Sequence, residues 1–123
     1  MFGPWYETDH DCCQHMRKDD TWYEMIQCVW LDTTEEDKRN GLHEYVIVKD
    51  VIDLRAYDVN DMECYISSYG YTMESLKEEY EDTMFDVIAE CILEETTMHD
   101  AYIVGFANTF EEAKEQIKKY INK

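Results

Sequence analysis

Apolar, aromatic and β-branched residues gather in three segments of the chain. This pattern predicts β-strands at residues 21–31, 42–57 and 101–107. The polar stretch 33–41 separates the first two segments, so we expect them to pair as a hairpin with a long loop. The alternation slips near Asp50, which indicates a bend in the second strand. Residues 1–20 show no clear period, and we interpret them as a loop or a loosely attached arm.

Helical spacing replaces this pattern after residue 59. Asn60 and Glu63 have the spacing of a capping box, so a first helix is expected to begin there, and Gly70 suits the C′ position that ends it. Thr72 can cap a second, longer helix at residues 73–93. The apolar positions of this helix recur every three or four residues, and those we expect to be buried are Leu76, Tyr80, Met84, Val87 and Cys91.

Two features of the long helix permit a different interpretation. Alternate residues from Val87 to Leu93 are also apolar, so a strand at 85–94 is the alternative, and a break near Asp82-Thr83 would divide the helix. We favour a helix because the 3.6-residue spacing is unbroken and because Glu, Met, Ala and Leu have high helix propensity.

A last helix is expected from Phe110 to about Asn122. Thr109 and Glu112 have capping-box spacing, and the lysines of the last turn suit the negative end of the helix dipole. Together the elements predict an α+β fold in one domain, residues 1–123. In this fold a small antiparallel sheet of about three strands is packed by a long acidic helix and two shorter helices.

The charge of the chain is strongly negative and unevenly distributed. Asp and Glu number 29 against 11 Lys and Arg, for a net charge of −18, yet hydrophobic residues at 45% suffice for a core. Residues 56–113 hold 15 acids and Lys77 as their single base, so this segment carries −14. Such a surface repels nucleic acids and anionic membranes and attracts basic proteins.

The sequence also restricts the setting and the chemistry. Because the N-terminus lacks a basic start and an apolar run, and no stretch of about 18 residues is apolar, we expect a cytoplasmic protein without a membrane partner. The five cysteines are then expected to be free thiols. No GxGxxG, P-loop or GxSxG motif is present, so we expect neither an enzyme nor a cofactor.

One cluster, His10, Cys12, Cys13 and His15, contains the residue types that bind zinc. Its spacing is poor for a metal site, because it has no CxxC pair and adjacent cysteines rarely reach one tetrahedral ion. We therefore expect no metal, while a metal-dependent role for residues 10–15 stays open as an alternative.

The acidic face of the predicted long helix is the strongest candidate for a binding site. Lys77 is the single base among nine acids from Glu74 to Glu95, and like charges at i,i+4 destabilise a helix by about 0.2–0.5 kcal/mol per pair. Carboxylates one turn apart lie about 6 Å apart along the axis, so a row of them can imitate phosphates. The expected partner-binding residues are the acids of this region and two neighbouring tyrosines: Asp58, Asp61, Glu63, Glu74, Glu78, Glu79, Glu81, Asp82, Asp86, Glu90, Tyr69 and Tyr71.

In its size, its acidic segment YEDTMFDVIAECILEETT and its lack of catalytic motifs, the chain resembles the small acidic inhibitors of phages and mobile elements, such as anti-CRISPR and antirestriction proteins. The resemblance is one of class and covers no aligned motif, so it transfers no functional residue. It implies a stoichiometric inhibitor that mimics DNA or RNA phosphates and blocks the site of a basic nucleic-acid-binding protein, such as a CRISPR effector or a restriction enzyme, without binding nucleic acid itself. The alternatives are an acidic adaptor that docks a basic partner without mimicry, and the metal-dependent regulator.

Overall fold

The computed structural model describes residues 2–8, 13–100 and 102–122, and for residues 97–100 it describes the backbone alone. Within these residues five strands form one antiparallel sheet in the order β1-β2-β3-β4-β5, and helices pack on it, so the α+β class is confirmed. The strands are β1 (Tyr6–Glu7), β2 (His15–Asp19), β3 (Trp22–Trp30), β4 (Tyr45–Asp53) and β5 (Tyr102–Ala107). The helices are α1 (Glu35–Arg39), α2 (Val59–Ser67), α3 (Met73–Glu79), α4 (Met84–Asp100) and α5 (Phe110–Ile121), with a short 3-10 turn at Leu54–Ala56.

The hairpin of β3 and β4 is the centre of the sheet, as the sequence predicted. Its register runs without interruption from Trp22 opposite Asp53 to Trp30 opposite Tyr45. The bend predicted near Asp50 is therefore wrong for this pair of strands, and the irregularity lies between β4 and β5 instead. Asp50 interrupts the apolar pattern because it is a buried polar residue, whose carboxylate accepts a hydrogen bond of 2.6 Å from the Thr96 hydroxyl on α4.

The sheet has more strands than the three that were predicted, because residues 1–20 contribute β1 and β2. All five residues of β2 pair with β3, and Met16 lies in the core at 1% exposure. The interpretation of this segment as a loop or arm missed both strands, since β2 has a single apolar residue and its pairing depends on β3. Asp20 lies in the tight turn between β2 and β3 and adopts φ 54°, a backbone conformation that Asp tolerates better than most residues.

The predicted long helix is two helices, α3 and α4, that meet at a break over residues 80–83. Tyr80 ends α3 with φ −129° and ψ 51°, so the helical path stops one turn before α4 begins. The strand considered for 85–94 is wrong, because these residues lie within α4. Of the apolar stripe, Leu76 and Cys91 are buried, whereas Tyr80, Met84 and Val87 are half-buried at the side of the helices.

The helix termini depend on local capping. Thr72 caps α3 and Thr109 caps α5 as predicted, while α2 is capped by Asp58, two residues before the predicted Asn60. Gly70 has the predicted C′ role: it adopts φ 81°, and the Tyr71 N–H donates to the Ile66 carbonyl in the pattern of a Schellman motif.

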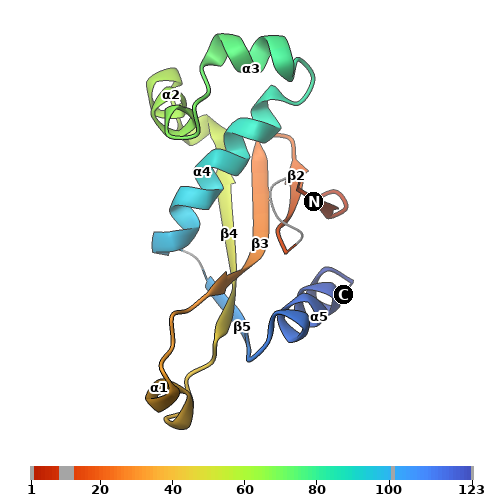
Figure 1. Ribbon diagram of the computed structural model, residues 1–123. Coiled ribbons are helices and arrows are strands. Elements are labelled where there is room, and N and C mark those ends of the chain that lie inside the picture. The colour runs from red at the N-terminus through yellow and green to blue at the C-terminus, as the bar shows by residue number, and fades with distance from the viewer. Residues whose placement is uncertain (1, 9–12, 101, 123) are drawn as a thin grey trace.

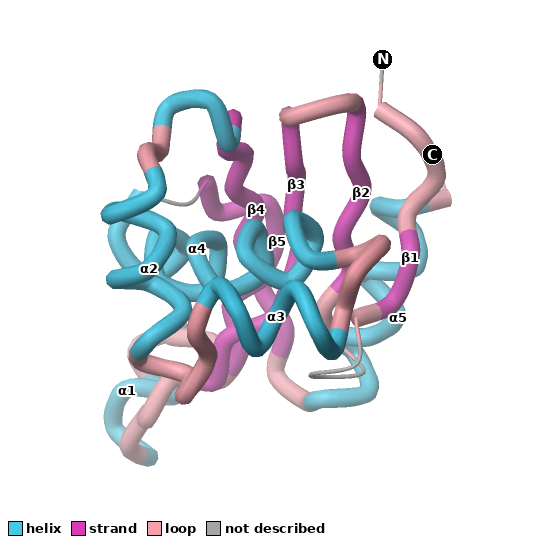
Figure 2. The backbone as a smooth tube through the Cα atoms, turned by 90° about the horizontal axis from the view of Figure 1, so that it is seen from above, coloured by secondary structure: helices cyan, strands magenta, loops and turns pink. Residues whose placement is uncertain are grey.

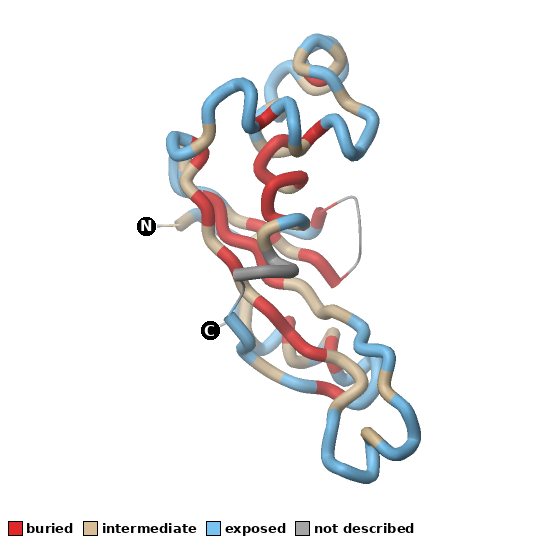
Figure 3. Tube along the Cα trace, turned by 90° about the vertical axis from the view of Figure 1, so that its left-hand side faces the viewer, coloured by how far each residue is buried: buried red, intermediate tan, exposed pale blue. Residues whose placement is uncertain are grey.

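The two faces of the sheet are covered by different helices and carry separate cores. Tyr23 and Met25 of β3 belong to the larger core beneath α2, α3 and α4, whereas Ile26, the residue after Met25, belongs to the smaller core on the other face, which includes Ile117 of α5. In Figure 3 the buried residues follow α4 and the strands, and exposed residues dominate both ends of the molecule. Figure 1 places α2 and α3 at the end opposite α1, and Figure 2 views that end directly.

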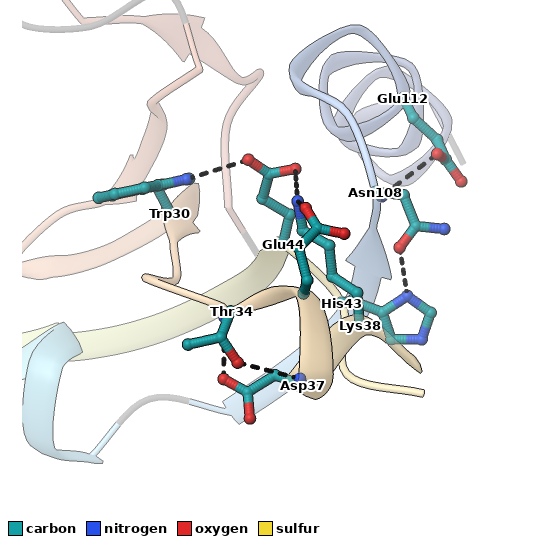
Figure 4. A network of polar contacts seen from close by, with 9 residues as sticks. Trp30, Thr34, Asp37, Lys38, His43, Glu44, Asn108 and Glu112 are labelled. Atoms are coloured by element: carbon teal, nitrogen blue, oxygen red, sulfur yellow. Dashed lines mark hydrogen bonds and ion pairs between the residues drawn. The ribbon is translucent and has the colours of Figure 1, made fainter. Parts of the chain in front are cut away.

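The connection between β3 and β4, predicted as a polar loop, contains the short helix α1 at the tip of the molecule. Its N-terminus is a capping box in which the Asp37 N–H donates to the Thr34 hydroxyl over 3.1 Å and the Thr34 N–H donates to the Asp37 carboxylate over 3.0 Å. The ring of His43 lies 3.0 Å from the Asn108 side chain, and the Asn108 N–H donates to Glu112 (Figure 4). These contacts join the tip to the start of α5.

Candidate functional site: an acidic end with a tyrosine pocket

The exposed acids of the predicted site gather on α2, α3 and the α3–α4 break, which form one end of the molecule (Figure 1). We call this surface the acidic end, and its exposed carboxylates are Asp58, Asp61, Glu63, Glu74, Glu78, Glu79, Glu81 and Asp82. Within the described part of the chain, none of the eight forms an ion pair with Lys or Arg. Asp58 and Asp61 form the capping box of α2, so six of these carboxylates remain without a structural role in a helix cap.

Asp86, which was predicted to lie on the same face, has partners inside the protein. Its carboxylate accepts a 2.8 Å hydrogen bond from the Tyr23 hydroxyl and lies 3.0 Å from the Lys18 ammonium. The expectation that Asp86 points away from the apolar stripe is therefore wrong, because the first turn of α4 faces β2 and β3. Asp86 connects α4 to the sheet, and a substitution there would alter folding as well as any surface interaction.

The tyrosines of this region line a pocket of about 320 Å³ beside the acidic end, which we call the tyrosine pocket. Tyr69 and Tyr71 enter it from either side of Gly70, and Tyr80 enters it from the end of α3. The remaining walls come from one face of α4, at positions that repeat every three or four residues: Val87, Glu90, Cys91 and Glu94. The break between α3 and α4 thus creates the pocket, because it turns Tyr80 toward α4.

Burial and hydrogen bonding raise the pKa of two tyrosines in the pocket. Burial and a hydrogen bond to Glu94 raise the pKa of Tyr69, and a hydrogen bond to Tyr80 raises the pKa of Tyr71. The rings of Tyr71 and Tyr80 meet edge to face, with centroids 6.4 Å apart and an interplanar angle of 85°. The phenol groups of Tyr69 and Tyr71 are therefore uncharged at neutral pH, and the rings of Tyr71 and Tyr80 are in contact.

The charge of the pocket comes from α4. Glu94 accepts hydrogen bonds from the Tyr69 hydroxyl and, over 3.3 Å, from the Gln14 side-chain amide, so its carboxylate is fixed. Burial, followed by the nearby Glu94 and Glu90, raises the pKa of the Cys91 thiol to about 12, so the thiol is neutral as well. The pocket therefore combines neutral aromatic walls with two carboxylates.

A second hollow of about 200 Å³ continues from the tyrosine pocket toward β1. The two hollows share Tyr80, Val87 and Glu90. Tyr6 of β1 lines the second hollow, and its pKa is raised to about 12 by burial and by the nearby Asp86 and Glu90. Acidic and aromatic side chains therefore line both hollows, which lie on either side of this shared wall.

The two described residues of the cluster considered for metal, Cys13 and His15, lie elsewhere, at the start of β2. Cys13 is buried at 2% exposure against Ile26 and Ile117, and His15 borders a separate hollow beside α5. Burial lowers the pKa of His15, against an opposing effect of Glu7. Among the described residues no three His, Cys, Asp or Glu side chains are placed to hold a metal ion, while His10 and Cys12 lie outside the described residues.

Tyr69, Tyr71 and Glu90 were predicted to bind a partner, and the structure brings these three together with Tyr80 and Glu94. Tyr80 was assigned to the buried stripe, since a continuous helix would have directed its ring into the core. Glu94 was not among the expected site residues, although it lies one turn after Glu90 on the same face of α4. The helical spacing from Glu90 was enough to predict Glu94 as a site residue. Tyr80 could be predicted to line the pocket only if the break between α3 and α4 was known.

Comparison with known proteins identifies no relative. No protein-family model, no curated protein and no solved structure matches the chain. None of the described helices has the length and apolar character needed to cross a membrane.

Proposed function

We propose that the protein is a stoichiometric inhibitor that binds a basic nucleic-acid-binding protein through its acidic end and blocks the nucleic-acid site of that partner. The observation that carries the proposal is the set of exposed carboxylates on α3 and the α3–α4 break, which have no Lys or Arg partner among the described residues. A stable surface of this kind stores like-charge repulsion, which a groove lined with Lys and Arg would relieve.

The alternative of an adaptor uses the same surface without competition for nucleic acid. In both cases association with a basic partner is steered by long-range attraction, so its rate falls steeply as salt rises. Only mimicry requires that the partner release its DNA or RNA. Competition therefore separates the two functions, and the class resemblance makes CRISPR effectors and restriction enzymes the first partners to test.

The test uses charge reversal on the acidic end, in the combined variant Glu78→Lys, Glu81→Lys and Asp82→Lys. All three side chains are exposed and lie outside the helix caps, so we expect the variant to fold. The matched control, Asp32→Lys, Glu35→Lys and Glu36→Lys, makes the same change in net charge on exposed residues at the opposite tip.

The measurement is displacement of a labelled oligonucleotide from the candidate partner. We expect the wild-type protein and the tip variant to displace it, and the acidic-end variant to lose at least about tenfold in potency, with the difference shrinking in high salt. The proposal is wrong if the acidic-end variant competes as well as wild type. If the protein binds the partner while saturating oligonucleotide leaves that binding unchanged, the adaptor function replaces mimicry.

A further inference from the structure

We propose that the tyrosine pocket receives the guanidinium group of an arginine side chain from the basic partner, an inference that rests on the proposed function. The acidic end supplies long-range attraction but little geometry, since its carboxylates are exposed to solvent. The tyrosine pocket, by contrast, has a volume of about 320 Å³ with aromatic and acidic walls, and it lies next to that surface.

The aromatic walls fit a planar cation. Aromatic ring faces carry negative electrostatic potential and attract cations, and guanidinium groups also stack on them because they are flat and weakly hydrated. Tyr71 and Tyr80 stand nearly perpendicular, so their rings present two differently oriented surfaces to an entering group. Tyr69 forms a further wall and is tied to Glu94.

The carboxylates select the charge of the ligand. Glu90 and Glu94 are one helical turn apart on α4 and both line the pocket. An ionised carboxylate has about four sites that can accept hydrogen bonds, and Glu94 is already positioned by Gln14 and Tyr69. The five N–H donors of a guanidinium can use such acceptors together, whereas an ammonium group presents a more strongly hydrated point charge.

No Lys or Arg is among the described residues that line the pocket. Lys18, on the neighbouring strand β2, is engaged by Asp86 instead. The second hollow shares Tyr80, Val87 and Glu90 with the pocket, and the Val87 side chain and Tyr80 ring offer apolar surface for the methylene groups of the arginine stem. The aromatic walls and the two carboxylates, rather than this stem contact, favour arginine over lysine.

The test compares hexa-arginine and hexa-lysine peptides, acetylated and amidated so that their charges are equal, in calorimetric titrations of the protein. We expect wild type to bind hexa-arginine about fivefold more tightly. Tyr80→Leu should abolish the preference, while Tyr80→Phe, which retains the ring, should keep it. Tyr102→Leu is the matched control, because Tyr102 lies on β5 at 69% exposure and lines none of the hollows described above. The combined variant Glu78→Gln and Asp82→Asn, which removes two charges, should lower the affinity for both peptides equally.

Because Tyr80 also packs against the larger core, amide chemical shifts of the wild-type protein provide a readout that needs no variant. Hexa-arginine, and not hexa-lysine, should shift the amides of Tyr69, Tyr71, Tyr80 and Glu90. Equal binding of the two peptides, or a preference that survives in folded Tyr80→Leu, would overturn the inference. If hexa-arginine is preferred but the protein does not compete with the oligonucleotide, the arginine pocket stands and the inhibitor function is refuted. If the protein competes but shows no preference for arginine, the inhibitor function stands and the arginine pocket is refuted.

Discussion

Glu24 shows how a charged residue can be essential to the sheet. Its side chain is 2% exposed, and its carboxylate lies 2.7 Å from an Arg17 nitrogen and 3.1 Å from the Lys49 ammonium. The Arg17 guanidinium is in turn covered by the rings of Phe2 and Trp5, at 4.9 and 4.3 Å from their centroids. One carboxylate of β3 therefore holds cations from both neighbouring strands on the face that α5 covers.

We predict that Glu24→Ala lowers the free energy of unfolding by about 3 kcal/mol, because removal of one partner leaves two partly buried cations facing each other without a counter-charge. Urea unfolding followed by circular dichroism measures the change. Glu36→Ala, at an exposed position of α1 with no ion pair among the described residues, should stay within about 0.5 kcal/mol of wild type. Equal unfolding midpoints for the two variants would contradict a structural role for Glu24.

At the scale of single elements, local chemistry accounts for most helix ends. Thr72, Thr109 and Gly70 have their predicted roles, since a cap or a left-handed turn needs only residues within one turn of the chain. The start of α2 is two residues earlier than predicted, because Asp58 and Asp61 form a reciprocal pair of bonds that competes with Asn60. The continuous helix favoured for residues 73–93 was the larger error, since the break considered near Asp82-Thr83 is present over residues 80–83 and determines the site.

We predict that Thr72→Ala lowers the free energy of unfolding by about 1 kcal/mol. The Thr72 hydroxyl accepts from the Ser75 N–H over 3.0 Å, and the Thr72 N–H donates to the Ser75 hydroxyl, so alanine leaves the first turn of α3 without its cap. Thermal or urea unfolding checks the value. Ser67→Ala is the control, because the Ser67 hydroxyl bonds only to the carbonyl of Cys64 in its own helix, and a loss as large as that of Thr72→Ala would show that hydroxyl deletion alone is costly.

At the scale of the whole molecule, positive and negative charges are separated. The cations of β2 and β4 are paired with Glu24 and Asp86 at the sheet, while Lys77 is the only base between residues 56 and 113, which include the acidic end. The net charge of −18 is therefore concentrated rather than diluted, and it opposes folding by self-repulsion. The acidic end therefore attracts a basic partner and also lowers the stability of the unbound protein.

We predict that reversing Glu78, Glu81 and Asp82 to Lys raises the free energy of unfolding at low salt by about 0.5–1 kcal/mol, because it relieves like-charge repulsion. The gain should largely vanish near 1 M salt, where the Debye length is about 3 Å. Reversal of Asp32, Glu35 and Glu36 should gain less, since Lys38 and Arg39 already offset part of the negative charge of that tip. A destabilised acidic-end variant would show instead that these carboxylates support the fold.

The sequence alone determined the features that depend on neighbours along the chain. These are the β3–β4 hairpin, strand β5, the caps of α3 and α5, and the acidic character of residues 56–113. Each follows from periodicity, capping chemistry or composition, which act over a few residues.

Tertiary structure decided the features that depend on partners distant in the sequence. Strand β2 forms because β3 offers its edge and because Glu24 and Asp86 receive Arg17 and Lys18. The tyrosine pocket likewise exists only where the end of α3 meets α4 and the turn after α2. Packing of α4 on the sheet selects which side of a helical stripe is buried, and spacing within the helix cannot specify that choice, because several adjacent faces carry apolar residues.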